Sequence, residues 1–277
     1  ESQAKALEFV KDPIQRAEVF AELARLYQLN LELDKSWDSA VKGFSELGIN
    51  LNAPGIIQAF DALRSYLFGL FIELTGLFVG TGSEKKKEYY RVAAYIAYIA
   101  AETAWFQLRL MPMTSLALQF YYLAQRVGPS QILVNALGRI AILFAELQMV
   151  KVAHEYSQKS MRLAEKLGDP GGKAFAKSFH TYCLLQTGDN LGSERESRTL
   201  LLESSKYMKA NDFINVVGNL CYNLIARGKC REVEGVLPIL IEKTEKSSSD
   251  LFKNHLFNAI VGVARSIAGN QTEANIY

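Results

Sequence analysis

The sequence predicts an all-α protein, built as a superhelical solenoid of antiparallel helical hairpins. Two observations lead to this fold class. Apolar residues recur with helical spacing along most of the 277 residues, while sustained alternation and Asn-Gly or Asp-Gly hairpin turns are lacking. Small residues also recur with a period of about 40 residues, which is typical of stacked helical repeats.

Proline, glycine and short polar segments mark the breaks between the expected helices. Pro13 and Pro170 suit a first helical turn, where a missing N–H costs nothing. In the first clear pair of helices, Asp34 is placed to cap the second helix and Gly48 to end it. The helices are predicted near 3–10, 14–30, 34–47, 55–80, 84–110, 113–127, 130–147, 150–167, 171–187, 190–209, 211–227, 230–246 and 250–268, with another start at 271.

The repeat is the strongest signal in the sequence. Two small residues three positions apart form a notch on a helix, so a repeated notch indicates a repeated helix–helix contact. Three sets of residues follow this period of 40 or 41 residues: the turn residues Gln148, Gly188, Gly228 and Gly269, and the small residues Ala141, Thr181, Cys221, Gly262 and Gly138, Ser178, Gly218, Ala259.

This pattern divides the chain into three parts. Residues 1–52 are expected to form one or more N-terminal hairpins, and 113–277 a series of repeats that is truncated at the C-terminus. Residues 53–112 are expected to form long apolar helices that are either a degenerate repeat or an interruption. Because the final TEANIY reads as the first turns of an unfinished helix, we expect a fragment of a larger protein.

Composition excludes several classes of function. Hydrophobic residues make up 49% and charged residues 22% of the chain, as in ordinary globular proteins. A formal net charge of +2 argues against a nucleic-acid partner, which needs a concentrated basic face. Three cysteines without a C-x-x-C pair, and an N-terminus without a signal-peptide pattern, predict a cytoplasmic protein in a reducing compartment.

Residues 65–83 raise the question of a membrane span, because this apolar stretch holds Glu73 as its only charge. The central position of Glu73, with Asp61 and Arg64 just upstream, favours a buried core helix, so membrane attachment is not expected. The aromatic segment 89–122 has two interpretations: its rings form core, which helical spacing favours, or they form an exposed partner surface.

No pattern of catalytic or ligand-binding residues stands out. The stretch GTGSEKKK at 80–87 lacks the spacing of a phosphate loop, so Lys85, Lys86 and Lys87 are expected in a solvated first helical turn. The three histidines form no metal-binding pair, and no nucleophile motif is present. We therefore expect a non-enzymatic protein with no cofactor and no metal ion.

Several phrases of the sequence resemble degenerate tetratricopeptide (TPR-like) repeats, namely LARLYQLNLELDKSWDSAVKGFSELG, ALGRIAILFAELQMVKVAHEYSQKSMRLAEKLGDP and SIAGNQTEA. The period is longer than the 34 residues of that family, and no unit carries its full motif. Units of this length resemble the helical repeat regions of large signalling ATPases, including transcription activators of the maltose-regulator type, of sensor kinases and of class III nucleotide cyclases. The resemblance covers residues 14–52 and 113–277.

The resemblance implies a binding groove that is lined by the first helix of each hairpin. Amide side chains pair with peptide backbones and tyrosines give contact area at low entropic cost, so these residue types suit peptide recognition. The alternative is that the tyrosines fill the core between repeats and the asparagines are merely solvated. The candidate partner-binding residues are Asn135, Arg139, Phe179, Tyr182, Asn215, Asn219, Tyr222 and Asn223.

Together these features predict a regulatory or scaffold module within a larger signalling protein. Its partner would be a protein or peptide, a neighbouring domain of the same polypeptide, or a second copy of the chain. The alternative is a small-molecule-sensing helical domain, with a pocket in 55–122 that regulates an attached catalytic domain.

Overall fold

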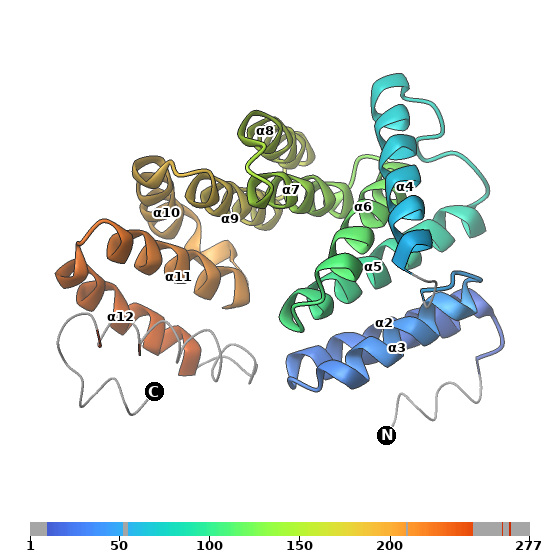
Figure 1. The fold of residues 1–277 in the computed structure, drawn as a ribbon, viewed down its shortest axis with the longest axis horizontal. Coiled ribbons are helices and arrows are strands. Elements are labelled where there is room, and N and C mark those ends of the chain that lie inside the picture. Colours follow the sequence, from blue (N-terminus) through green and yellow to red (C-terminus); the bar gives the residue numbers. More distant parts are fainter. Residues whose placement is uncertain (1–9, 52–54, 209, 246–261, 263–265, 267–277) are drawn as a thin grey trace. The chain divides into compact units, whose positions relative to one another are not determined.

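The structure of the chain is a computed structural model that describes residues 10–51, 55–208 and 210–245 and the single residues 262 and 266 (Figure 1). These residues form α-helices with short connections and one 3-10 turn, and they include no β-strand. The prediction of an all-α protein is therefore confirmed. The chain divides into two compact units, Glu1–Ile140 and Ala141–Tyr277, so that the boundary falls within one helix.

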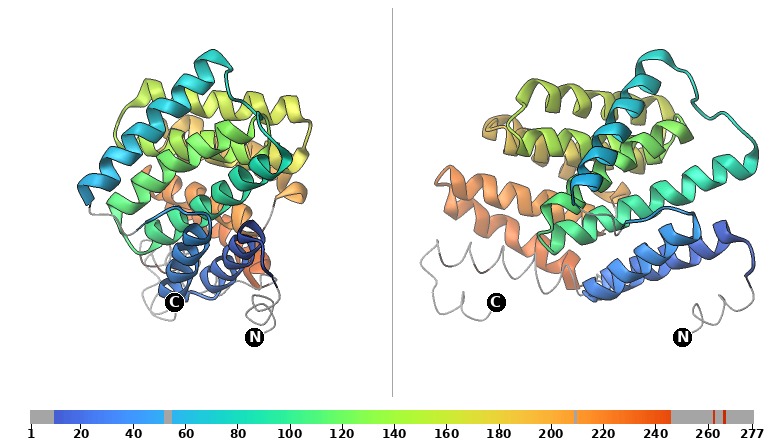
Figure 2. Two further views of the ribbon diagram at one scale, coloured as in Figure 1. Left: turned by 90° about the vertical axis from the view of Figure 1, so that its right-hand side faces the viewer. Right: turned by 45° about the vertical axis from the view of Figure 1, so that its right-hand side comes forward.

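Unit 1 is organised around its longest helix, α5. Helices α2 and α3 lie side by side as a hairpin and both contact α5, while α6 contacts α5 on one side and α4 on the other (Figure 2). The inward face of α5 is rich in alanine, which lets three neighbouring helices approach closely. The helices are α2 (Pro13–Leu29), α3 (Leu33–Glu46), α4 (Gly55–Thr75), α5 (Glu84–Phe106), α6 (Leu110–Val127) and the first turns of α7 (Gln131–Glu146).

Unit 2 continues the pairing of successive helices. Helix α9 contacts α8, α10 and α11, and α11 contacts α10 and α12. Its small, buried side chains include Ala145, Ala153 and Cys183, which pack together where α7, α8 and α9 meet. Besides the end of α7, the unit contains α8 (Val150–Leu167), α9 (Pro170–Gln186), α10 (Asn190–Ser204), α11 (Ala210–Ala226) and α12 (Cys230–Glu245).

The observed helices match most of the predicted ones within a few residues, and those expected at 3–10, 250–268 and from 271 fall outside the description of the structure. Prolines begin α2 and α9 as expected, each behind an aspartate cap: Asp12 Oδ1 accepts from the Ile14 N–H at 2.8 Å. The cap predicted for α3 is wrong. The helix starts one residue earlier, so Asp34 lies in its first turn and accepts from Gln107 Nε2 at 2.9 Å.

One turn geometry recurs at the period found in the sequence. Leu108, Gln148, Gly188 and Gly228 all adopt a left-handed conformation, with φ between 55° and 84°. In each case the N–H of the next residue binds the carbonyl five positions back, as in the pair Met149 and Phe144 at 2.8 Å. This hydrogen bond, with a second from the left-handed residue itself, defines a Schellman motif. The helices that follow begin at Leu110, Val150, Asn190 and Cys230, so turn and helix start share one 40-residue spacing.

Six small residues of the repeat, on α7, α9 and α11, are buried as predicted, whereas Gly262 is half-buried. Ala141, Thr181 and Cys221 are fully buried, and Gly138, Ser178 and Gly218 are buried as well. Thr181 shows how close the helices come, because its backbone carbonyl accepts a hydrogen bond from Ser193 Oγ of α10 at 3.0 Å. Ala259 and Gly269, the last members of the predicted series, are not among the residues that the structure describes.

Helix α4 departs from the sequence prediction. It was expected to be a buried core helix, yet only 17% of its most apolar 18-residue window is buried. Its inner face packs on α6, while large apolar side chains such as Phe60 and Leu74 are exposed. The helix is long and apolar enough to cross a bilayer, which for one isolated helix is weak evidence of a span.

The aromatic segment 89–122 contributes to the core only in part. Phe120 and Tyr121 of α6 are buried, whereas Trp105 at the end of α5 is 40% exposed.

Lys85 and Lys86 lie exposed in the first turn of α5, behind the cap Ser83, as the sequence predicts.

Candidate functional site

Five of the predicted binding residues lie at or near the surface of unit 2. Phe179 and Tyr182 on α9 are half-buried, and so is Asn219 on α11. Asn215 and Tyr222 on α11 are exposed. Since α9 and α11 contact each other, these five side chains belong to two neighbouring helices, and we refer to them as the α9–α11 face.

Two aromatic rings pack against each other on the α9 side of this face. The rings of Phe175 and Phe179 lie with centroids 4.5 Å apart, tilted by 36°. Phe175 lies one helical turn before Phe179, and Tyr182 lies one turn after it. The three aromatic side chains therefore share one side of α9. Asn215 and Asn219, one turn apart on α11, supply amide groups. A surface of this kind can bind an extended peptide through backbone hydrogen bonds and ring contacts.

Asn223 does not belong to this face. Its side chain is fully buried, and Nδ2 donates to the backbone carbonyl of Asn190 at 2.8 Å, which ties α11 to the start of α10. The sequence held a signal for this position. The residues 40 and 80 positions earlier are Cys183 and Leu143, both of them apolar and buried, so the repeat itself marks 223 as a core position.

Asn135 and Arg139 belong to unit 1, where both side chains have partners. Asn135 Oδ1 accepts from Gln131 Nε2 at 2.8 Å. Arg139 forms an ion pair with Glu102 of α5 and lies over the ring of Tyr98, 5.1 Å from its centroid. Burial lowers the pKa of Arg139, but Glu102 and Tyr98 more than offset it, so the guanidinium stays charged. Arg139 thus links α5 to α7 within the unit.

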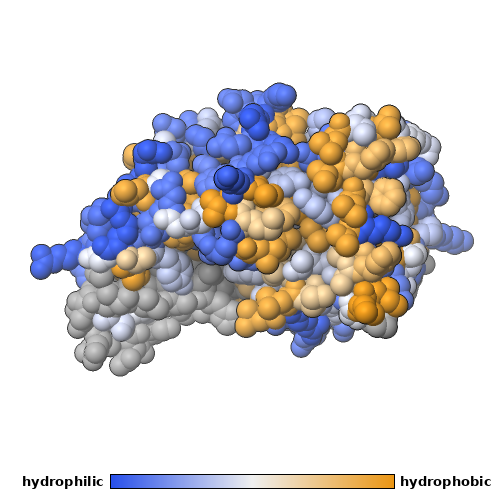
Figure 3. Space-filling model, turned by 45° about the horizontal axis from the view of Figure 1, so that its top comes forward, coloured by the Kyte–Doolittle hydropathy of each residue, from blue (hydrophilic) through white to orange (hydrophobic). Residues whose placement is uncertain are grey.

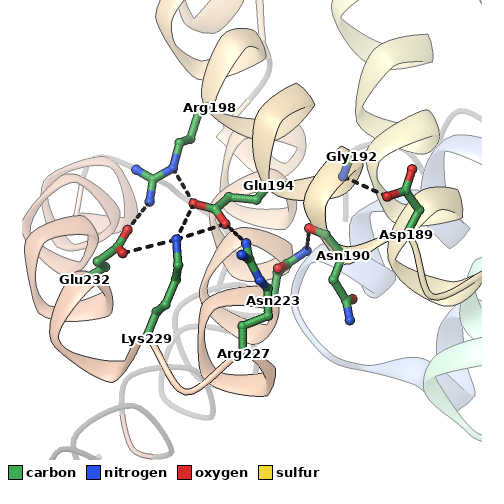
Figure 4. A network of polar contacts seen from close by, with 9 residues as sticks. All are labelled: Asp189, Asn190, Gly192, Glu194, Arg198, Asn223, Arg227, Lys229 and Glu232. Carbon is green, nitrogen blue, oxygen red and sulfur yellow. Dashed lines mark hydrogen bonds and ion pairs between the residues drawn. The ribbon is translucent and has the colours of Figure 1, made fainter.

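A group of charges that sequence reasoning did not single out surrounds Glu194 on α10 (Figure 4). Its carboxylate accepts from Arg198 at 3.1 Å, from Lys229 at 3.3 Å and from Arg227. Glu232 completes the network by binding Arg198 at 2.6 Å and Lys229 at 3.2 Å. Burial raises the pKa of Glu194, but the three cations outweigh it, so the pKa lies below its usual value.

This network surrounds a shallow depression of about 370 Å³, lined by the same basic side chains together with Leu191 and Arg195. Because Glu194 already occupies the centre of the cations, the depression offers little unpaired positive charge to a phosphate or carboxylate ligand. Its members come from α10, from the turn between α11 and α12, and from the first turn of α12, so these ion pairs hold α10 to the α11–α12 turn.

Unit 2 contains two histidines and two buried cysteines whose side chains the structure describes. His154 and His180 lie with ring centroids 6.5 Å apart, and Ser157 Oγ is 2.8 Å from His180 Nδ1. Burial raises the pKa of Cys183 to about 11 and that of Cys221 to about 12, so both thiols stay protonated and unreactive at neutral pH. Within the part of the chain that the structure describes, no three metal-binding side chains converge.

The apolar outer face of α4 is the other prominent surface. Its exposed side chains run along the helix and into the following turn, at Leu77 and Phe78. In Figure 3 hydrophobic side chains gather on the right of the view, where α4 lies. A cavity of about 170 Å³ on this helix is lined by Phe60, Leu63, Arg64, Leu67 and Phe68. It is a surface hollow on one helix and is smaller than typical ligand pockets of about 300–1,000 Å³.

No protein-family model, no curated protein and no solved structure matches the chain.

Proposed function

We propose that the chain is a tetratricopeptide-like solenoid of helical hairpins that binds a protein or peptide and performs no chemistry of its own. The recurrent Schellman turn carries this proposal. The residues at 108, 148, 188 and 228 all have a left-handed backbone conformation, and a new helix begins two residues after each of them. A stack of equivalent hairpins requires such a recurrent turn. Each hairpin would then bury its apolar face against its neighbours, as the small residues of α9 and α11 do.

The proposed binding surface is the α9–α11 face. In such a stack, corresponding positions of successive first helices fall next to each other, and Tyr182 and Tyr222 are separated by one 40-residue period, as are Phe179 and Asn219. Tyrosine, phenylalanine and asparagine together offer ring contacts and amide hydrogen bonds to an extended chain. Asn135 and Arg139 already bind Gln131 and Glu102, and Asn223 is buried, so we leave these three out of the proposed surface.

The wider role rests on the resemblance of the sequence to the repeat regions of signalling proteins. In this proposal the chain is a cytoplasmic regulatory or scaffold segment of a larger signalling protein, and its groove receives a peptide, a neighbouring domain or another copy. The alternative of a small-molecule sensor with a pocket in 55–122 gains little support, because the hollow on α4 is small and open.

Selection from a random-peptide phage library on the immobilised chain tests the proposal. Peptides that bind the wild type should bind the double variant Asn219→Ala/Tyr222→Ala at least about tenfold more weakly, because both side chains at the centre of the face are removed. Tyr207→Ala is the matched control, since Tyr207 is similarly exposed elsewhere in unit 2. Peptides that bind the double variant as tightly as the wild type, or a selection that enriches no peptide, would refute the α9–α11 face as a binding site.

A further inference from the structure

The apolar residues on the outer face of α4 follow a heptad pattern. Counted along the helix, the apolar residues alternate between steps of four and three, which is the spacing that keeps one stripe of a helix in contact with another helix. All but Leu70, which is half-buried, are at least half exposed. We call this set the α4 stripe: Ile56, Phe60, Leu63, Leu67, Leu70 and Leu74.

The opposite face of α4 packs against α6. Gly69 lies so close to α6 that an added Cβ would come within 2.7 Å of the Tyr121 ring. Glu73 is also turned inward, where it accepts a hydrogen bond from the hydroxyl of Tyr121 and one from Gln125 Nε2 at 3.4 Å. Rotating α4 to bury the stripe within unit 1 would break these contacts and turn Glu73 outward. The stripe therefore needs an occupant from outside the unit.

The stripe and its exposed neighbours are large enough for a stable helix–helix interface. At roughly 200 Å² for a large apolar side chain, their exposed fractions amount to roughly 1,000 Å². One partner of a standard protein interface buries about 800 Å², whereas the largest apolar patch of a typical monomer is about 300–600 Å². The neighbours that add to the stripe are Ile57, Phe68, Phe71, Leu77 and Phe78.

The charges on α4 favour a copy of the same helix over a lipid surface. Helices that lie on membranes carry lysine and arginine along their polar flank, whereas α4 contains no lysine and one arginine, Arg64. Arg64 already pairs with Asp61 at 3.1 Å, so the flank of the stripe is electrically neutral. A second α4 that runs in the opposite direction presents the same neutral apolar surface and the same pair of charges, which makes the face complementary to itself.

We propose that the α4 stripe packs against the α4 stripe of a second copy of this chain, across a two-fold axis, as an antiparallel pair of helices. Such a contact is isologous, and two-fold dimers are the commonest oligomers of soluble proteins. This surface lies in unit 1 and is distinct from the α9–α11 face in unit 2. The dimer and the peptide-binding function can therefore be tested independently.

Light scattering coupled to size exclusion, without detergent, tests this proposal on the full chain. The wild type should elute as a dimer, and Leu63→Glu/Leu67→Glu as a monomer with the same helical circular dichroism. Leu202→Glu is the matched control, because Leu202 is 86% exposed on α10, and it should remain dimeric. If the glutamate variant fails to fold, Leu63→Ala/Leu67→Ala should weaken dimerisation at least about tenfold in analytical ultracentrifugation.

Two results would overturn the proposal. The first is a wild type that is monomeric at micromolar concentration, and the second is a dimer that both α4 variants leave intact. If the monomeric wild type sediments with vesicles of phosphatidylcholine and phosphatidylserine while Leu63→Glu/Leu67→Glu does not, the stripe binds a lipid surface instead.

Discussion

The close approach of α4 to α6 makes a sharp prediction about Gly69. An alanine Cβ at this position would lie 2.7 Å from Cδ1 and Cε1 of Tyr121 and 3.3 Å from Cα of Tyr122. Contacts between carbon atoms are optimal at about 3.5–4.0 Å, so the ring or the helix must move by nearly 1 Å. Tyr121 has little room to do so, because it is fully buried and its hydroxyl binds Glu73.

Two opposing effects set the magnitude for Gly69→Ala. Overpacking of a close contact costs about 1–3 kcal/mol, whereas replacing glycine by alanine inside a helix gains about 1 kcal/mol. Loss of the Tyr121–Glu73 hydrogen bond would add about 1 kcal/mol or more to the cost. We therefore expect the free energy of unfolding of unit 1 to fall by about 1–3 kcal/mol.

Urea unfolding followed by tryptophan fluorescence measures this change, because the two tryptophans, Trp37 and Trp105, both lie in unit 1. Gly55→Ala is the matched control: it changes the same helix at its first residue, where a Cβ meets nothing within 4 Å. A Gly69→Ala variant that is at least as stable as Gly55→Ala would refute the packing of α4 on α6.

Three further predictions concern the turns and the buried polar groups. Leu108→Gly should stabilise unit 1 by about 1 kcal/mol in the same urea assay, because Leu108 is held at φ 55° with its side chain 82% exposed. Arg139→Met should cost about 2–4 kcal/mol, since it leaves the half-buried Glu102 without its cation, and Glu102→Leu in the same chain should restore most of the loss. Burial lowers the pKa of His180, against the opposing charges of nearby acidic groups, so protonation favours the unfolded chain. Stability that is present above about pH 6.5 should be lost as the pH falls towards 5, and His180→Gln should reduce this dependence in urea unfolding followed by circular dichroism.

The sequence predicted the helices and their period because both depend on local spacing. The left-handed turns at Gly188 and Gly228 were readable from glycine, which adopts this conformation without strain. The equivalent turn at Leu108 was missed, because a leucine gives no such signal even though the backbone follows the same path. The burial of Thr181 and Cys221 followed from their place in the repeat.

Exposure and side-chain partners could not be read in the same way, because they depend on segments far away in the sequence. The apolar sequence of α4 fits a core helix, and only its one-sided contact with α6 shows that the stripe is left uncovered. The ion pairs of Glu194 with Arg227 and Lys229 join residues more than 30 positions apart, which no local pattern reveals. The resemblance to TPR-like repeats predicts Asn223 in the groove, although its counterparts 40 and 80 residues earlier, Cys183 and Leu143, are buried.

The central claim is that successive hairpins stack so that corresponding positions of their first helices lie side by side. Pyrene labels on Tyr182→Cys and Tyr222→Cys measure this directly. The labelled chain also carries Cys230→Ser, which removes one native thiol, and the other two, Cys183 and Cys221, are buried and do not meet the reagent. Packed helices lie about 8–10 Å apart, so the doubly labelled chain should show strong excimer emission that disappears in urea. Labels at Tyr182→Cys and Leu202→Cys provide the control. Monomer emission alone from the 182 and 222 pair, with helicity retained, would contradict the stacked repeat.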